Sequence, residues 1–259
     1  MEVLKRFKKA VDNYLSVATL PIAVKLFERR EDVPINIGRP IRDLGEPIRP
    51  CEGWHFARHK GISVAMLEED FSTECPHALF VFGILEPIQQ WIEGDLTYEI
   101  SAGSREAAAN MARNVFRLDV GKYKGMALAP LGEADFTPDL VMIYCDSRQA
   151  QRLILAAGWT NGEPLKSSMA GTCVCSEGIV QPFQIGQPVV AIPCGGDRKY
   201  AGAQDHEIVF TTPFDKLEGI IKGLEASKKA HEVENLGGES KLEKRYGEMA
   251  RALNEQLVR

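Results

Sequence analysis

Short apolar runs limit what this chain can fold into more than any other feature of its sequence. Each run is long enough for a β-strand, and none approaches the roughly 18 apolar residues that a membrane-spanning helix needs. The runs cover residues 22–27, 62–67, 126–131, 140–144, 189–192 and 208–212. Segments with helical spacing of apolar residues lie between them. The sequence therefore predicts an α/β or α+β fold, with a mixed sheet and surrounding helices, and leaves the strand order open.

Several helices have recognisable beginnings. Residues 2–16 form an amphipathic pattern, and Ser104 is a good N-cap for residues 105–118. Further helices are expected at residues 147–157 and 214–230. Pro76 suits the first turn of a helix that the apolar run 78–85 continues. The four prolines and many charges of residues 28–50 indicate a loop.

The C-terminal residues differ in character from the rest. Gly237 and Gly238 follow a charged helix, and a last amphipathic helix comes after them. Its apolar stripe consists of Leu242, Tyr246, Met249, Leu253 and Leu257. We therefore expect a single α/β domain at residues 1–230 and a C-terminal helical arm at residues 231–259. The stripe either packs on its own domain or contacts a partner, and we expect a homo-oligomer, most simply a dimer.

Composition and motifs exclude several classes of function. The net charge is −5 and no basic stripe is present, so nucleic acid is not an expected partner. The first residues lack the apolar core and cleavage site of a secretory signal, so we expect a cytoplasmic protein with no membrane association. The sequence has no P-loop, no dinucleotide-binding glycine motif and no nucleophile elbow.

The chain has six cysteines, which in a reducing compartment indicate metal ligands, redox groups or buried thiols rather than disulfides. Cys75 and Cys175 precede short helices, whose free amides and dipole favour a thiolate. Cys194 precedes two glycines, which let backbone amides approach a sulfur closely. Cys145 ends an apolar run, which is typical of a buried thiol on a strand. The spacing of the cysteines alone does not show whether they form one metal site or are buried at different places in the fold.

Other polar residues lie near the cysteines in the sequence. Arg198 could supply a positive charge near Cys194, and His77 could donate a hydrogen bond to a sulfur. His55 and His59 have the i, i+4 spacing of zinc ligands on a helix, but no metalloprotease motif surrounds them. We therefore interpret that pair as ordinary packed or solvated side chains.

Several segments together carry a resemblance to a known family. They are PIAVKLF, the isolated Cys51, ECPHALFVFG, CSEGIVQPFQIGQP, IPCGGDRKYAG and EIVFTTPFDKLEGIIKGL. At these segments the sequence resembles the domain of unknown function 169 family, which is common in anaerobic bacteria and archaea. The resemblance extends over roughly residues 5–225 and leaves out the C-terminal arm.

The resemblance implies a set of metal ligands. The recurring cysteines of the family fall on Cys51, Cys75, Cys175 and Cys194, which leaves Cys145 and Cys173 as extras. By count, four thiolates suit a [4Fe–4S] cluster and a tetrahedral zinc ion equally well. The anaerobic bias and the glycine-rich surroundings favour iron–sulfur, and whether Cys173 replaces Cys175 stays open. Further residues are expected to contact and tune the cofactor rather than bind metal: Gly195, Gly196, Arg198 and His77.

The expected function is an iron–sulfur redox or electron-transfer protein, whose redox partner is an unidentified protein or small molecule. One alternative is an enzyme that acts on an unknown small substrate at the cysteine–metal site. The other is a zinc-stabilised accessory protein without turnover. The sequence leaves open whether the chain is an enzyme, and it identifies no substrate.

Overall fold

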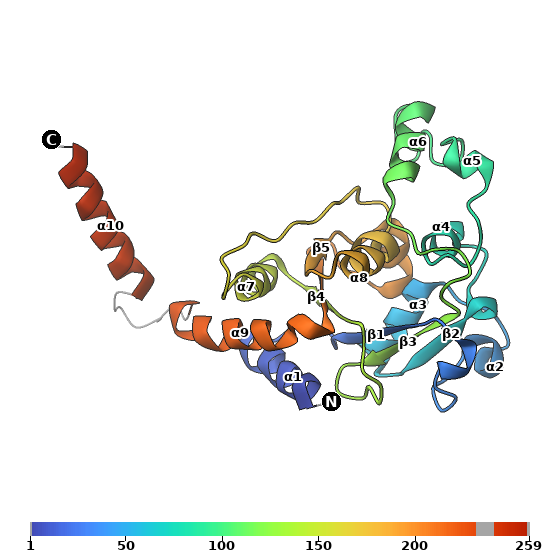
Figure 1. Cartoon of the computed structure of the whole chain (residues 1–259), viewed down its shortest axis with the longest axis horizontal. Helices are drawn as coiled ribbons and strands as arrows, with labels where there is room; N and C mark the ends of the chain where they lie inside the picture. Colours follow the sequence, from blue (N-terminus) through green and yellow to red (C-terminus); the bar gives the residue numbers. More distant parts are fainter. Residues whose placement is uncertain (1, 232–240, 258–259) are drawn as a thin grey trace.

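A six-stranded antiparallel sheet forms the centre of the computed structural model, which describes residues 2–231 and 241–257 (Figure 1). The strand order is β2-β3-β1-β4-β6-β5. Every pairing between these strands is antiparallel. The strands are β1 (Ile22–Phe27), β2 (Val64–Leu67), β3 (Gly125–Pro130), β4 (Leu140–Cys145), β5 (Val189–Ala191) and β6 (Ile208–Pro213).

Helices surround the sheet, and some of them are short. The α-helices are α1 (Glu2–Tyr14), α2 (Pro40–Leu44), α3 (Pro50–His55), α4 (Pro76–Val81), α5 (Gln89–Ile92), α6 (Arg105–Asn114), α7 (Ser147–Ala157), α8 (Gln181–Ile185), α9 (Leu217–His231) and α10 (Lys241–Leu257). Single turns of 3-10 helix are η1 (Arg30–Asp32), η3 (Glu68–Asp70) and η6 (Phe214–Lys216). Segments of π-helix are η2 (Phe56–Lys60), η4 (Cys175–Val180) and η5 (Asp197–Ala201).

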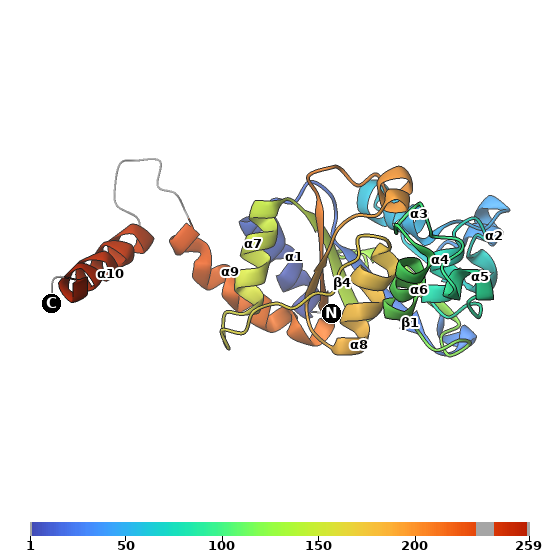
Figure 2. The ribbon, with the colours of Figure 1, turned by 90° about the horizontal axis from the view of Figure 1, so that it is seen from above.

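The two faces of the sheet are covered by different helices, as Figure 2 shows. Successive side chains of a strand point to opposite faces, so neighbours on β4 enter different cores. Tyr144 lies in the core shared with α3, α4 and η4. Cys145 lies in the core shared with α1, α7 and α9. This alternation decides which chemistry-bearing side chains can meet.

Most of the predicted strands and helices are confirmed. The predicted fold class, a sheet with surrounding helices, is confirmed as well. The helix predicted at residues 147–157 has those bounds because Asp146 caps it. The Asp146 side chain accepts from the Gln149 amide at 2.7 Å, and the Gln149 side chain accepts from the Asp146 amide at 2.8 Å. At the predicted N-cap Ser104, the hydroxyl accepts from the Ala107 amide at 3.1 Å.

Three local predictions were wrong. The helix expected at residues 105–118 ends at Asn114, where the chain becomes extended. The helix that begins at Pro76 ends at Val81 instead of continuing to residue 85. The chain turns at Gly83, which has a φ of 66° and lies where a Cβ atom would be 2.6 Å from the Asp119 carbonyl oxygen. Residues 28–50 are also not loop throughout, because they include the short helix α2, which starts at a proline and ends before Gly45 at φ 82°.

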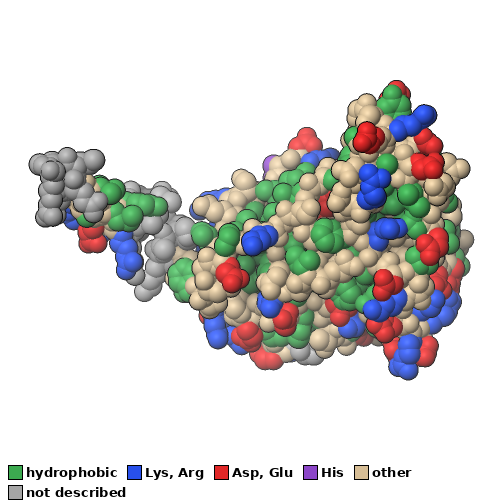
Figure 3. Space-filling model, turned by 45° about the horizontal axis from the view of Figure 1, so that its top comes forward, with side chains coloured by type: hydrophobic (Ala, Val, Ile, Leu, Met, Phe, Trp, Pro, Cys, Tyr) green, Lys and Arg blue, Asp and Glu red, His purple; other side chains and the backbone are tan. Residues whose placement is uncertain are grey.

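The last helix predicted from the sequence is α10. Its Tyr246, Met249 and Leu253 are exposed, and Figure 3 shows hydrophobic side chains on this helix beside charged ones. The Gly237-Gly238 break lies outside the described residues. Within the described ranges, no helix combines the length and the apolar character needed to cross a membrane.

Candidate metal centre

Helix beginnings on one face of the sheet bring five of the six cysteines together. Cys51 is the second residue of α3, and Cys75 directly precedes α4. Cys173 and Cys175 lie at the start of the helical segment that continues through η4 and α8. Cys194 precedes the helical residues 195–201, and its carbonyl oxygen accepts from the Arg198 amide at 2.9 Å. All five side chains belong to, or pack against, one buried cluster.

Electrostatic effects show how near one another these thiols lie. Burial raises the pKa of Cys51, and the neighbouring Cys75, Asp197 and Cys194 raise it further. Burial also raises the pKa of Cys194 to about 11, and Cys173 adds to that effect. In the chain without metal these two thiols therefore stay protonated at neutral pH. A metal that binds them has to displace those protons.

Cys173 and Cys175 interact directly. A side-chain hydrogen bond between the two thiols lowers the pKa of Cys173 and raises that of Cys175. Burial and the nearby Cys75 and Cys51 raise the pKa of Cys175 further. Cys175 therefore lies near Cys75 and Cys51, two of the other predicted ligands, and Cys173 lies beside it. The sequence assigned one member of the pair to the site, and the structure brings both to it.

Backbone amides lie near several of these cysteines. The Ala78 amide donates to the Cys75 carbonyl oxygen at 3.1 Å and lowers the pKa of the Cys75 thiol, and the amides of Val174 and Asp197 lower the pKa of Cys194. Each of these effects favours the thiolate. A cluster ligated by four thiolates is anionic, and nearby amides offset that charge. In chemical character, buried and half-buried thiols with amides nearby fit an iron–sulfur cluster.

The arrangement of the side chains is a separate matter from their chemistry. Within residues 2–231 and 241–257, no three His, Cys, Asp or Glu side chains are placed to hold a single metal ion. The thiols are neighbours, but they do not form the coordination shell of one ion. This finding supports neither zinc nor a cluster, and both stay predictions.

Cys145 lies apart from the other cysteines, on the opposite face of the sheet. Its Sγ donates to the Ile208 carbonyl oxygen at 3.5 Å, and burial raises the pKa of its thiol to about 12. These are the properties of a buried thiol that packs on a strand.

A buried carboxylate beside the cysteines was not predicted from the sequence. Asp197 accepts from Trp54 Nε1 at 2.9 Å and from the Tyr144 hydroxyl at 2.8 Å. Burial raises its pKa to about 6. The Arg58 guanidinium lies 3.5 Å from the centre of the Tyr144 ring and pairs with Glu207. Trp54 and Tyr144 of this polar network lie in the same buried cluster as Cys51, Cys173 and Cys175.

The π-helical segments η2, η4 and η5 all contribute to this region. They carry Arg58, Cys175 and Asp197 respectively. Segments of π-helix are uncommon and occur often at functional sites, because the wider turn re-aims side chains. The only sign of this network in the sequence is the acidic residue of GGDRKYAG, Asp197. Its partners Trp54 and Tyr144 lie far from it along the chain.

The other residues predicted to contact the cofactor have ordinary partners as well. Arg198 donates to the exposed Asp205 at 3.1 Å, and Gly195 and Gly196 lie in the first helical turn after Cys194. His77 packs edge-on against Trp91, with ring centres 6.0 Å apart, and burial lowers its pKa.

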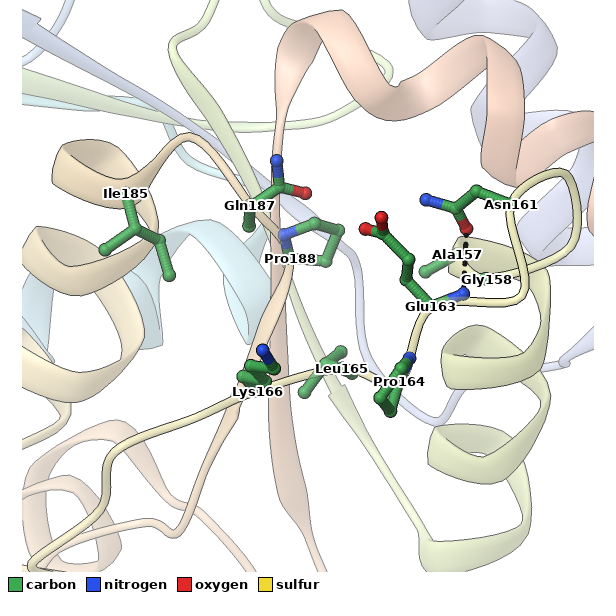
Figure 4. A pocket seen from close by; sticks show the side chains of 10 residues that line it. All are labelled: Ala157, Gly158, Asn161, Glu163, Pro164, Leu165, Lys166, Ile185, Gln187 and Pro188. Carbon is green, nitrogen blue, oxygen red and sulfur yellow. Dashed lines mark hydrogen bonds between the residues drawn. The ribbon is translucent and has the colours of Figure 1, made fainter.

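A cavity of about 450 Å³ lies away from the cysteines, between the segment after α7 and the end of α8 (Figure 4). Asn161, Glu163 and Gln187 lie around it, and the Asn161 side chain accepts from the Glu163 amide at 3.2 Å. No cysteine lines this cavity, and its Glu163 and Lys166 are exposed. We assign it no part in the metal centre.

Comparisons with known proteins agree with the resemblance seen in the sequence. The chain is 26% identical over 206 residues to "Uncharacterized protein MJ0308" of Methanocaldococcus jannaschii, an alignment that covers 79% of this chain and 86% of that protein. No solved structure matches significantly. The model of the family DUF169, described as "Uncharacterised ArCR, COG2043", matches residues 10–223. Because that match covers most of the chain, this protein belongs to the DUF169 family.

Proposed function

We propose that this protein binds an iron–sulfur cluster and serves in redox chemistry or electron transfer. Cys51, Cys75, Cys175 and Cys194 would hold the cluster. The single observation that carries the proposal is the convergence of buried and half-buried thiols at helix beginnings, beside backbone amides that lower the pKa of Cys75 and Cys194. A cluster bound there would supply transfer of single electrons.

The chain's own groups would perform three tasks around such a cluster. Cys51 and Cys175 are buried and Cys75 and Cys194 are half-buried, which limits the access of water and so affects the reduction potential. The backbone amides near Cys75 and Cys194 offset the negative charge of the thiolates. The bonds from Trp54 and Tyr144 hold the Asp197 carboxyl in place beside the sulfurs. The electron partner is a protein or a small molecule.

Purification without oxygen tests this proposal. The protein should be brown, absorb broadly at about 400 nm and contain about four iron and four sulfide per chain. Addition of a reductant should bleach the absorption. A colourless protein with about one zinc per chain would contradict the proposal and favour the accessory protein.

We also expect a homo-oligomer in which α10 contributes to the contact. Tyr246, Met249 and Leu253 are exposed, and a helix of this length is marginal alone in water. Truncation after residue 236 should lower the mass measured by light scattering and leave the metal content unchanged. Met249→Glu should have the same effect, whereas Glu248→Gln beside it should not. A full-length protein that is already monomeric would contradict this prediction.

A further inference from the structure

The cavity of about 450 Å³ drawn in Figure 4 is lined by three pieces of chain. They are the end of α7 at Ala157, the segment 161–166, and the segment 185–188 that connects α8 to β5. The volume falls within the range of about 300–1,000 Å³ that is typical of sites for small molecules. No cysteine is among the described residues that line the cavity, so a ligand there is separate from the proposed metal centre.

Two contacts hold the backbone of the segment 161–166 in place. Gly158 lies where a Cβ atom would be 2.9 Å from the Glu163 carbonyl oxygen, so the chain folds closely against the end of α7. Just after the segment, the Val190 amide of β5 donates to the Ser167 hydroxyl at 2.8 Å. The wall is therefore fixed at both ends before a ligand binds. A site that is already formed avoids part of the entropy cost of binding.

Polar side chains along this wall are left to a ligand or to water. Within the described residues, the side chains of Glu163, Lys166 and Gln187 make no hydrogen bond or ion pair. Figure 4 shows the Glu163 carboxylate and the Asn161 amide toward the α7 end of the cavity, and Lys166 toward the α8 end. The cavity therefore offers one negative and one positive charge that are separated from each other.

The end of α7 adds to the preference for a cation beside Glu163. The last carbonyl groups of a helix carry a partial negative charge, and α7 has 11 residues. An ammonium group at this end of the cavity is therefore favoured by the carboxylate and by the helix. Leu165 and Pro188 lie between the two charged ends and offer apolar surface (Figure 4). The Gln187 amide can both donate and accept hydrogen bonds.

We propose that this cavity binds a free dipeptide as a zwitterion. Its ammonium group would pair with Glu163 at the α7 end, and its carboxylate with Lys166 at the α8 end. Residues three apart in an extended chain lie at most about 10 Å apart, which suits the separated charges of a dipeptide better than those of a single amino acid. The Asn161 and Gln187 amides would exchange hydrogen bonds with the peptide group. This binding does not rest on the proposed iron–sulfur function.

Alanyl-leucine is a suitable probe, because its charges can be removed one at a time. N-acetyl-alanyl-leucine lacks the ammonium group, alanyl-leucine amide lacks the carboxylate, and leucine has both charged groups on one carbon atom. We expect the dipeptide to bind saturably with a dissociation constant of about 1 mM, and the other three to bind at least about fivefold more weakly. Saturation-transfer NMR of the leucine methyl signals measures binding to the full chain.

Two variants assign the charges. Glu163→Gln should weaken the binding of alanyl-leucine about fivefold and leave that of the acetylated form unchanged. Lys166→Gln should weaken the binding of alanyl-leucine about fivefold and leave that of the amide unchanged. Both side chains are exposed, so both variants should fold, which circular dichroism checks. Glu86→Gln and Lys5→Gln remove exposed charges outside the cavity wall and should change nothing.

Each outcome decides one part of the proposal. Absence of saturable binding of alanyl-leucine, or binding that is unchanged in both Glu163→Gln and Lys166→Gln, would overturn it and leave water as the occupant. If the acetylated form or the amide bound as tightly as the dipeptide, the zwitterion would be the wrong ligand class. Equal binding of leucine would overturn the separation of the two charges. Iron and sulfide are measured on the same samples, and their absence would refute only the iron–sulfur function.

Discussion

Replacement of Cys194 by serine should reduce the iron bound by the anaerobically purified protein to background. Serine offers a hard oxygen ligand with a much higher pKa, and a cluster that loses one of four soft thiolates is no longer held. The same loss is expected for Cys51→Ser and Cys75→Ser. Iron and sulfide per chain are measured after purification, together with the absorption at about 400 nm.

Cys145→Ser is the matched control for these variants. Cys145 is also a buried free cysteine, but its side chain lies on the opposite face of the sheet. Its replacement should leave the iron content unchanged. Loss of iron in Cys145→Ser as large as in Cys194→Ser would show that the loss reports misfolding rather than ligation.

Cys173 and Cys175 need a direct comparison. We predict that Cys175→Ser loses iron and that Cys173→Ser keeps it. Both thiols lie near Cys75, because Cys173 raises the pKa of Cys75 and Cys75 raises the pKa of Cys175, so nearness to Cys75 does not distinguish them. The opposite result would assign the ligand to Cys173 and leave the rest of the proposed site intact.

The sheet was predictable from the sequence because its signals are local. An apolar run such as residues 22–27 and a capped helix such as residues 147–157 are defined by their own residues and immediate neighbours. The strand order was not predictable, because β1 lies between β3 and β4, which follow it by about a hundred residues. The short helix α2 also escaped prediction, since a buried side chain from outside the segment supports it. Asp70 accepts from the Ile41 amide at 3.0 Å.

The candidate site was partly predictable for the same reason. The positions of Cys75 and Cys175 at helix beginnings follow from adjacent residues, and the resemblance to the family singled out four cysteines. Whether those cysteines meet depends on which face of the sheet each helix covers. The role of Asp197 depends on Tyr144, 53 residues away, and on Trp54, 143 residues away. No local pattern in the sequence carries that information.

Asp197→Ala should lower the free energy of unfolding by about 2–4 kcal/mol, because it leaves two buried donors without an acceptor. Trp54 is 1% exposed and Tyr144 is 2% exposed, so water cannot replace the lost carboxylate without entering the core. Chemical denaturation measures the effect. Loss of a single donor in Tyr144→Phe should cost less, about 1 kcal/mol.

Asp205→Ala is the control for this prediction, because its carboxylate is fully exposed and pairs only with Arg198 among the described residues. Exposed ion pairs contribute about 1 kcal/mol or less. Alanine at position 197 keeps the backbone amide that favours the Cys194 thiolate, so the variant should still bind metal when folded. If Asp197→Ala were no less stable than Asp205→Ala, the buried network would contribute nothing to folding.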